Sequence, residues 1–141
     1  MSGMSEGVGP ICGDATARLG QAVIDTDDPA RLAEFYRRLL GWTYDHQGED
    51  WTCIVGPGGV ELAFQLAINH RPPTWPGPEV PQQMHLDFYV DDLAAATARA
   101  IDLGAREAGV DAGRTYITLL DPSGHPFCLC LAPELRDAPL Q

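Results

Sequence analysis

An internal repeat constrains the fold of this chain more than any other feature. The segment QAVIDTDDPARLAEFYRRLLG, starting at Gln21, aligns with HLDFYVDDLAAATARAIDLGA, starting at His85, at an offset of 64 residues. Further on, GPGGVELAFQ aligns with DPSGHPFCLCL at an offset of 65, or of 67 if a small insertion is allowed. One copy cannot cover both faces of its own sheet, so two copies must associate, within one chain or between chains.

Each copy predicts the order strand, helix and three strands. In the first copy these elements fall at residues 19–26, 29–40, 42–46, 51–55 and 60–66. Its helix has Asp27 or Asp28 as the N-cap and Pro29 at the first position, and Gly41 ends it. In the second copy, strands at 84–90, near 106, at 114–120 and at 126–131 accompany an Ala-rich helix that runs from Asp91 or Asp92 to Gly104.

The predicted organisation is one domain of the α+β class with a tail at each end. Residues 1–17 have no apolar period, and residues 133–141 are polar with two prolines, so we expect tails there. The domain covers 18–132, with module 1 at 18–66 and module 2 at 83–132. Between them, residues 67–82 hold five prolines, which favours an extended linker or lid.

The charge of the chain excludes some partners. Twenty acidic residues face nine basic ones, all arginine, for a net charge of −11. A nucleic-acid binder needs a basic stripe, which is missing, and an anionic membrane surface is disfavoured for the same reason. We expect no signal peptide and no membrane span, and therefore a cytoplasmic protein. A neutral or cationic small ligand is compatible with this charge.

Strand alternation sorts the side chains into two kinds of face. In the strand at 84–90, Leu86, Phe88 and Val90 share one face, which we expect a helix to cover. The opposite faces of the sheets carry a mixed set: Gln21, Val23, Asp25, Glu61, Ala63, Gln65, His85, Asp87, Tyr89, Cys128 and Cys130. Such a set either meets bulk water or lines a wet cavity, because burying it dry is costly. The cavity is the favoured interpretation, since Tyr89 and the two thiols are unusual on an exposed surface.

Two βαβββ copies, the helix start DDP…FYRRLLGW, the strand MHLDFYV followed by DD, and DPSGHPFCL together resemble the vicinal oxygen chelate superfamily. More narrowly, residues 18–132 are similar to its glyoxalase-like and bleomycin-resistance-like members. The resemblance implies a curved mixed sheet around a cavity. It also implies metal ligands from the first and last strand of each module, at Gln21, Glu61, His85 and Cys128, although the 65-residue offset would place Ala63 where Glu61 is proposed. Cys128 stands where metal-dependent isomerases of the family have their carboxylate base, which argues against glyoxalase I chemistry.

Two functions remain open. The first is a binding protein that holds an aromatic or cationic molecule in the cavity between the paired βαβββ modules, without turnover and without a cofactor. The second is a metal-dependent lyase, isomerase or dioxygenase using Zn, Ni, Mn or Fe. Candidate proton carriers are His85 and Asp87, although a lone His at a strand start is commonly a structural residue. Candidate ligand contacts are Gln21, Gln65, Trp75, Tyr89, Arg114 and Cys130; for Arg114 a surface salt bridge is the alternative. We expect a homodimer.

Overall fold

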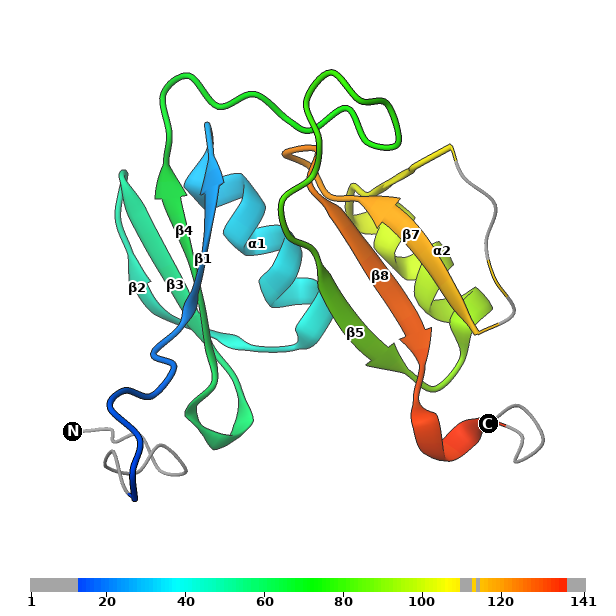
Figure 1. Cartoon of the computed structure of the whole chain (residues 1–141), viewed down its shortest axis with the longest axis horizontal. Coiled ribbons are helices and arrows are strands. Elements are labelled where there is room, and N and C mark those ends of the chain that lie inside the picture. Colours follow the sequence, from blue (N-terminus) through cyan, green and yellow to red (C-terminus); the bar gives the residue numbers. More distant parts are fainter. Residues whose placement is uncertain (1–12, 110–112, 114, 137–141) are drawn as a thin grey trace. The chain divides into compact units, whose positions relative to one another are not determined.

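The computed structural model describes residues 13–109, 113 and 115–136 of the chain (Figure 1). The chain divides into two compact units, Met1–His70 and Arg71–Gln141, with the boundary in the proline-rich segment of the sequence. Module 1 (18–66) lies in the first unit and module 2 (83–132) in the second, and each is described by itself.

Module 1 contains the predicted βαβββ order. Its elements are β1 (Ala22–Thr26), α1 (Pro29–Leu40), β2 (Thr43–Gln47), β3 (Trp51–Val55), a short 3-10 helix (Pro57–Gly59) and β4 (Glu61–Leu66). The four strands form one mixed sheet in the order β1-β4-β3-β2. The pair β1 and β4 is parallel, whereas β4, β3 and β2 are antiparallel neighbours.

Module 2 repeats that architecture strand for strand. Its elements are β5 (Leu86–Val90), α2 (Leu93–Leu103), β6 (Arg106–Glu107), β7 (Tyr116–Leu120), β8 (Pro126–Leu131) and a 3-10 helix (Pro133–Leu135). The sheet order is β5-β8-β7-β6, with β5 parallel to β8. The predicted α+β class with two βαβββ units is therefore confirmed.

Both helices begin and end where the local chemistry predicts. Of the two aspartates that could cap each helix, the second does so: Asp28 accepts from the Arg31 backbone N–H at 3.1 Å, and Asp92 from the Ala95 N–H at 3.0 Å. These bonds satisfy backbone donors that have no partner within the helix. Gly41 ends α1 in the left-handed conformation, with φ at 72°, which glycine adopts without strain.

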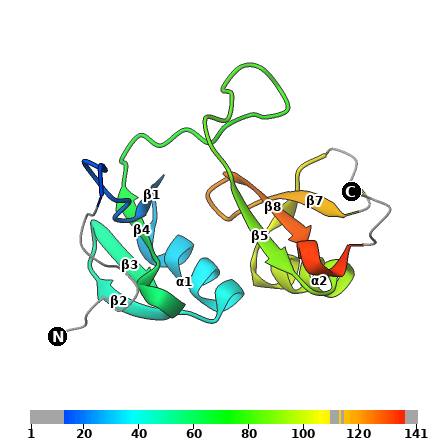
Figure 2. The same ribbon diagram turned by 60° about the horizontal axis from the view of Figure 1, so that its bottom comes forward.

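One face of each sheet packs against its helix. In module 1, α1 lies on β3 and β4, and the Tyr36 ring stacks on Phe64 with ring centroids 5.8 Å apart (Figure 2). In module 2, α2 lies on β8 and β7, where Phe127 meets Phe88 edge-on at 6.0 Å. The fully buried residues Leu32, Ile54, Leu119 and Leu129 complete these two cores. The opposite side of each sheet, called the helix-free face below, is covered by no helix that the described residues of its own module form.

Several strands begin later than the sequence predicts. The strand β1 begins at Ala22 rather than Leu19, because its ladder with β4 begins with the pair Ala22 and Leu62. Likewise β5 begins at Leu86 rather than Met84, and β7 at Tyr116 rather than Arg114. The strand β2 begins one residue later than predicted, because its ladder with β3 begins with the pair Thr43 and Val55. Trp42 precedes the ladder, and its ring packs over the backbone of Gly56.

The segments outside the modules differ in part from the expected tails and linker. Within the expected C-terminal tail, Pro133–Leu135 forms a 3-10 helix, while residues 1–12 and 137–141 lie outside the described residues. The proline-rich segment contains no helix or strand from 67 to 85. None of the helices in the described ranges is long and apolar enough to cross a membrane.

Candidate functional site

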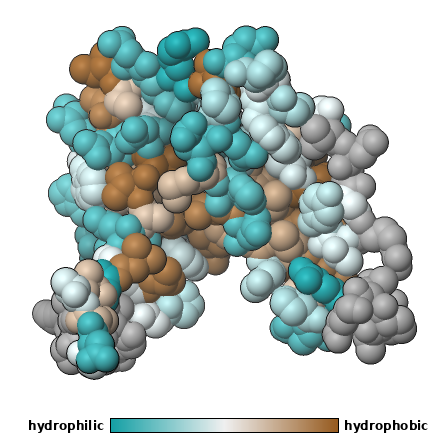
Figure 3. Space-filling model, viewed as in Figure 1, coloured by the Kyte–Doolittle hydropathy of each residue, from teal (hydrophilic) through white to brown (hydrophobic). Residues whose placement is uncertain are grey.

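The helix-free face of module 2 brings the predicted catalytic residues together. Its cross-strand register places Asp87 beside Cys128 and Cys128 beside Thr118. One rung further along, Tyr89 pairs with Cys130 and Cys130 with Tyr116. Because register partners point to the same side of a sheet, these two rungs form one continuous surface. In the view of Figure 1, α2 lies behind β7 and β8, and Figure 3 shows polar and apolar residues interspersed on the side turned to the reader.

A cluster of three potential metal or proton-transfer groups consists of Asp87 and Cys128 on the first rung and His85, which directly precedes β5. His85 Nε2 lies 3.1 Å from Asp87 Oδ1, and both side chains are about half exposed, at 43% and 54%. One ligand atom each from His85, Asp87 and Cys128 lies within 4.8 Å of the other two. The pair is an ion pair when His85 is protonated, and otherwise a hydrogen bond in which the imidazole donates.

The thiol of this cluster is held in its neutral form. Burial raises the pKa of Cys128, the neighbouring Asp87 raises it further, and a hydrogen bond with Thr118 opposes the rise. The Thr118 Oγ1 atom lies 3.2 Å from Cys128 Sγ. Burial also raises the pKa of Cys130. Neither thiol is therefore a ready nucleophile at neutral pH, because the thiolate is the reactive form.

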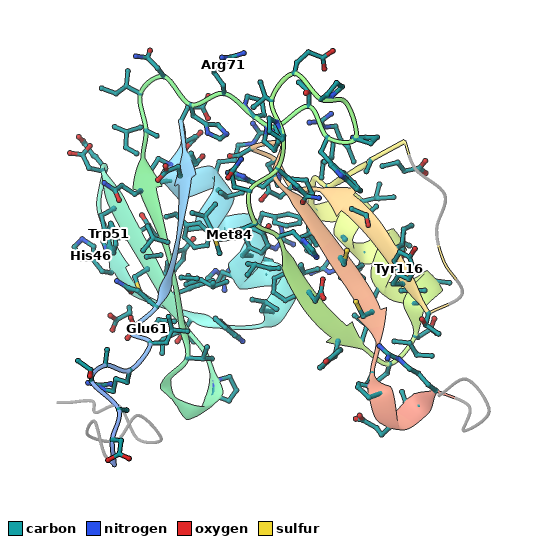
Figure 4. The ribbon with its side chains drawn as sticks, viewed as in Figure 1. His46, Trp51, Glu61, Arg71, Met84 and Tyr116 are labelled. Carbon is teal, nitrogen blue, oxygen red and sulfur yellow. The ribbon has the colours of Figure 1, made fainter. Side chains whose placement is uncertain are left out.

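Two tyrosines flank Cys130 on the second rung. Tyr89 is 68% exposed and Tyr116 45% exposed, whereas Cys130 between them is buried at 9%. Figure 4 labels Tyr116 on β7. The Tyr116 ring lies over the backbone of Gly113, where a β-carbon would come within 2.2 Å of it. Aromatic rings presented this way offer flat apolar area next to the Asp87 carboxylate, an arrangement suited to a cationic aromatic molecule.

The helix-free face of module 1 holds a second polar cluster, around a thiol that the sequence analysis did not single out. Cys53 Sγ lies 3.7 Å from Gln21 Oε1 and 3.5 Å from Glu61 Oε1. The Cys53 residue is only 3% exposed. Burial, and then the hydrogen bond and charge of Glu61, raise the pKa of Cys53 to about 12. Figure 4 labels Glu61 at the start of β4.

Comparison of the two ladders shows which positions are equivalent. In module 1, Ala63 pairs with both Val23 and Cys53; in module 2, Cys128 pairs with both Asp87 and Thr118. The 65-residue offset therefore describes the last strand, and Ala63 is the counterpart of Cys128. By the same register Glu61 is the counterpart of Pro126. A strict repeat therefore does not place a metal ligand at position 61.

The remaining predicted ligand contacts are dispersed. Gln65 is exposed and lies between Asp25 and Trp51 in the ladder. Trp75 is half-buried in a loop that Thr74 closes: the Thr74 N–H donates to Val80 O at 2.6 Å, and the Val80 N–H to Thr74 Oγ1 at 2.8 Å. Arg114 lies outside the described residues.

The donor atoms of module 2 suit a divalent metal of the kind that the fold implies. An imidazole nitrogen, a carboxylate oxygen and a thiolate sulfur are ligands that zinc accepts, and nickel, manganese and iron share some of them. His85 and Asp87 supply the first two within a small volume, and Cys128 would supply the third by losing its proton to a bound ion. Of the four predicted ligands, His85 and Cys128 belong to this cluster, while Gln21 and Glu61 belong to the cluster of module 1.

Comparison with known proteins identifies the class. The fold is that of solved glyoxalase-related proteins: a glyoxalase/bleomycin resistance protein/dioxygenase family enzyme from Burkholderia phytofirmans is similar, with a TM-score of 0.61 and 18% identity over 80% of this chain and 97% of that one. A glyoxalase-related enzyme from Fulvimarina pelagi has the same TM-score of 0.61 and 18% identity, over 82% and 88% of the two chains.

A third similar structure has a bound ligand. The bleomycin-binding protein of Streptomyces verticillus, solved with copper(II)-bleomycin, has a TM-score of 0.54 and 14% identity over 84% of this chain and 99% of that one. At these identities the likeness concerns the fold. The model of the glyoxalase-like domain family matches residues 21–130, so the chain belongs to that family and to the vicinal oxygen chelate superfamily. Among curated proteins no sequence matches it significantly.

Three residues of these clusters escaped the sequence analysis. Cys53, Thr118 and Tyr116 all lie on the middle strands β3 and β7. The alternation that was applied to the strands β1, β4, β5 and β8, continued through WTCIV and YITLL, would have placed Cys53, Tyr116 and Thr118 on the helix-free faces. The missing information was the register, because alternation within one strand does not say which residue of the next strand lies beside it.

Proposed function

We propose that this chain binds a small organic molecule, aromatic or cationic, on the helix-free face of module 2. The observation that carries the proposal is the pair of exposed tyrosines, Tyr89 and Tyr116, on one rung, with the Asp87 carboxylate on the next. An exposed aromatic surface next to an anionic group favours a flat ligand with positive charge. The net charge of −11 attracts such a ligand from a distance.

The similar structures agree with binding as a function. The Streptomyces verticillus neighbour is a bleomycin-binding protein, so this fold accommodates a large ligand in that case. The neutral state of Cys128, at the position where the resemblance implies a catalytic carboxylate, removes the base that glyoxalase I chemistry would need. These two observations support binding without turnover as the first candidate.

A metal-dependent lyase, isomerase or dioxygenase is the second candidate, and the His85, Asp87 and Cys128 cluster favours it. A divalent ion held there would supply Lewis-acid polarisation of a substrate oxygen. Asp87 would hold the His85 imidazole in place, and His85 or Asp87 would carry a proton when not engaged with the ion. Analysis of metal content in the purified chain and in His85→Ala tests this candidate: stoichiometric metal that is lost in the variant supports it.

We further propose that the protein is a homodimer and that it works in the cytoplasm. The basis is the βαβββ architecture, in which paired modules commonly associate between chains as well as within one, and the net charge of −11, which disfavours an anionic membrane surface. Light scattering coupled to size exclusion tests the oligomeric state directly: a mass near 30.4 kDa, twice the 15.2 kDa of one chain, is expected.

Binding is tested with proflavine, a planar cation, and with anilinonaphthalene sulfonate, an apolar anion, as fluorescent probes. We expect saturable proflavine binding that weakens at least tenfold in Tyr89→Ala and in Asp87→Asn. The control Ile101→Ala removes an exposed apolar side chain from α2 and should leave binding unchanged. Preference for the anion, or equal affinity of all variants for proflavine, contradicts the proposal.

A further inference from the structure

A positive charge lies at one end of the surface formed by the two rungs of module 2. Arg136 follows the 3-10 helix Pro133–Leu135, and its side chain turns back to β8, where Nε donates to the Leu131 backbone oxygen at 3.0 Å. The Leu131 N–H donates to Thr115 O at 2.7 Å, on the β7 side. Because the N–H and C=O of one strand residue point to the same side, Arg136 lies beside the start of β7, next to the second rung.

The thiol between the two tyrosines lies within reach of two opposite charges. Burial is the largest cause that raises the pKa of Cys130, the charge of Asp87 raises it further, and the charge of Arg136 lowers it. Along β8, Asp87 lies beside the rung before Cys130, whereas Arg136 is bound one residue after it. An anionic and a cationic group therefore flank the tyrosine rung, one at each end.

The guanidinium of Arg136 is held in a way that leaves it able to bind an anion. Its Nε is engaged with the backbone, whereas Nη1 and Nη2 have no hydrogen-bond or ion-pair partner within residues 13–109, 113 and 115–136. The residue is half-buried, and the backbone bond fixes the orientation of the planar group. Two parallel N–H donors at its free end match the two oxygens of a carboxylate. Because the group is already ordered, binding costs it less conformational entropy.

The distance between the two charges suits one aromatic ring. Register places Asp87 beside Cys128, three residues before Leu131. At about 3.3 Å per residue and about 4.8 Å between strands, the Asp87 carboxylate and the Arg136 guanidinium lie on the order of 10 Å apart. Contacts of about 3 Å at each end leave roughly 4–7 Å between the charges of a ligand, the length of a benzene ring substituted at opposite positions.

We propose, resting on the binding function above, that the ligand of module 2 is an aromatic zwitterion. Its cationic end meets Asp87, its ring lies on Tyr89 and Tyr116, and its carboxylate is bound by Arg136. Such a molecule has no net charge, so the net charge of −11 does not repel it. Arg136 then distinguishes the zwitterion from a simple cation, which finds no partner at that end of the surface.

The experiment measures displacement of proflavine from the full chain by three competitors that differ in one group each. Benzamidine carries the cation alone, benzoate the anion alone, and 4-amidinobenzoate both, at opposite positions of one ring. Arg136→Gln is the test variant, because it removes the charge and keeps a polar side chain. Arg99→Gln is the matched control, since it removes one positive charge from α2, where Arg99 lies 3.8 Å from Asp102.

We expect 4-amidinobenzoate to bind at least fivefold more tightly than benzamidine to the wild type and to Arg99→Gln, and benzoate to bind more weakly than both. The preference should disappear in Arg136→Gln. Proflavine should bind Arg136→Gln no more weakly than the wild type, which also establishes that this variant folds. The comparison of competitors on the wild type needs no variant at all.

Equal binding of the zwitterion and of benzamidine by the wild type overturns the proposal, and so does a preference that survives in Arg136→Gln or disappears in Arg99→Gln. In each of these cases proflavine still binds, and the proposed function stands. If neither proflavine nor benzamidine binds the wild type, the proposed function fails, and the assignment of a zwitterion fails with it.

Discussion

Module 1 and module 2 share one backbone plan but carry their chemistry at different places on it. In module 1 the thiol is Cys53 on β3, buried among oxygen atoms of Gln21 and Glu61. In module 2 the thiol at the neighbouring ladder position is Cys128 on β8, half-buried next to an imidazole and a carboxylate. The thiol of module 2 thus lies one strand away from the position that corresponds to the thiol of module 1. The repeat therefore constrains strand order and helix position, while the helix-free face is free to diverge.

The turn before the last strand shows the same division between backbone and side chain. GPGG at 56–59 and DPSG at 121–124 make equivalent backbone hydrogen bonds: Gly59 N–H to Gly56 O at 3.1 Å, and Gly124 N–H to Asp121 O at 2.8 Å. In module 2 the buried Asp121 carboxylate also accepts from the Ser123 and His125 N–H groups, at 2.9 and 3.0 Å. In module 1 that position must be glycine, because a β-carbon on Gly56 would lie 2.2 Å from the Trp42 ring.

The largest predicted effect contrasts the two faces of the sheets. Phe64 is fully buried against Tyr36, so Phe64→Ala should lower the free energy of unfolding by about 3–5 kcal/mol. Tyr89 on the helix-free face of module 2 is 68% exposed, and Tyr89→Ala should cost less than about 0.5 kcal/mol. Urea unfolding followed by circular dichroism measures both. Similar losses of unfolding free energy in the two variants would mean that the Tyr89 side chain is buried rather than exposed.

The next effect tests the two turns. Asp121→Ala leaves two backbone N–H groups without their acceptor, which should cost about 2 kcal/mol. Gly56→Ala should cost a comparable amount for a different reason, since its new methyl group collides with Trp42. Adding Trp42→Ala should relieve the second loss and leave the first unchanged. If the double variant shows no relief, the ring is not what excludes a side chain from position 56.

Thiol labelling sharpens the comparison of the two clusters. Cys53 is 3% exposed with a pKa raised to about 12, whereas Cys128 is half-buried. At pH 8, iodoacetamide should modify Cys128 more than tenfold faster than Cys53, because burial and a small thiolate fraction both slow the reaction. Mass spectrometry of peptides identifies the modified residue. Faster modification of Cys53 would contradict its placement among Gln21 and Glu61.

Much of the fold, and half of the site, could be predicted from the sequence. Helix starts followed to within one residue from the pairs 27–28 and 91–92, and the end of α1 from Gly41, because capping is a local effect of a few neighbouring atoms. The faces of β5 followed from alternation alone. Strand starts did not, because β1 and β5 begin where a partner strand becomes available, which is a property of the ladder.

Side chains contributed by β3 and β7 could not be assigned to a cluster for the same reason. His85 and Cys128 were expected in one site, and they lie in one cluster with Asp87. Cys53 was not expected in a polar cluster, because that cluster forms only through its contacts with Gln21, directly before β1, and with Glu61 on β4. Only the register brings these three together, and the sequence does not state it.

The smallest effect is a pH dependence confined to module 1. Hydrogen bonds from Arg37 and Tyr44 lower the pKa of Glu34 from 4.5 to about 2. A carboxyl with a depressed pKa stabilises the fold above its unfolded pKa, and this contribution is lost as the pH falls from about 4.5 through about 2. Because the Glu34 side chain is 44% exposed, Glu34→Gln should cost below about 1 kcal/mol at pH 7. The difference between variant and wild type should vanish near pH 2, as measured by urea unfolding; a difference that grows on acidification would reverse the assigned sign.

The central claim is that ligand binding belongs to the helix-free face of module 2, and a backbone amide NMR titration with proflavine tests it most directly. The account predicts that the shifted amides cluster on β5, β7 and β8, around Asp87, Tyr89 and Tyr116, while those of α2 stay in place. Shifts that gather on α2, or on module 1 alone, would contradict it.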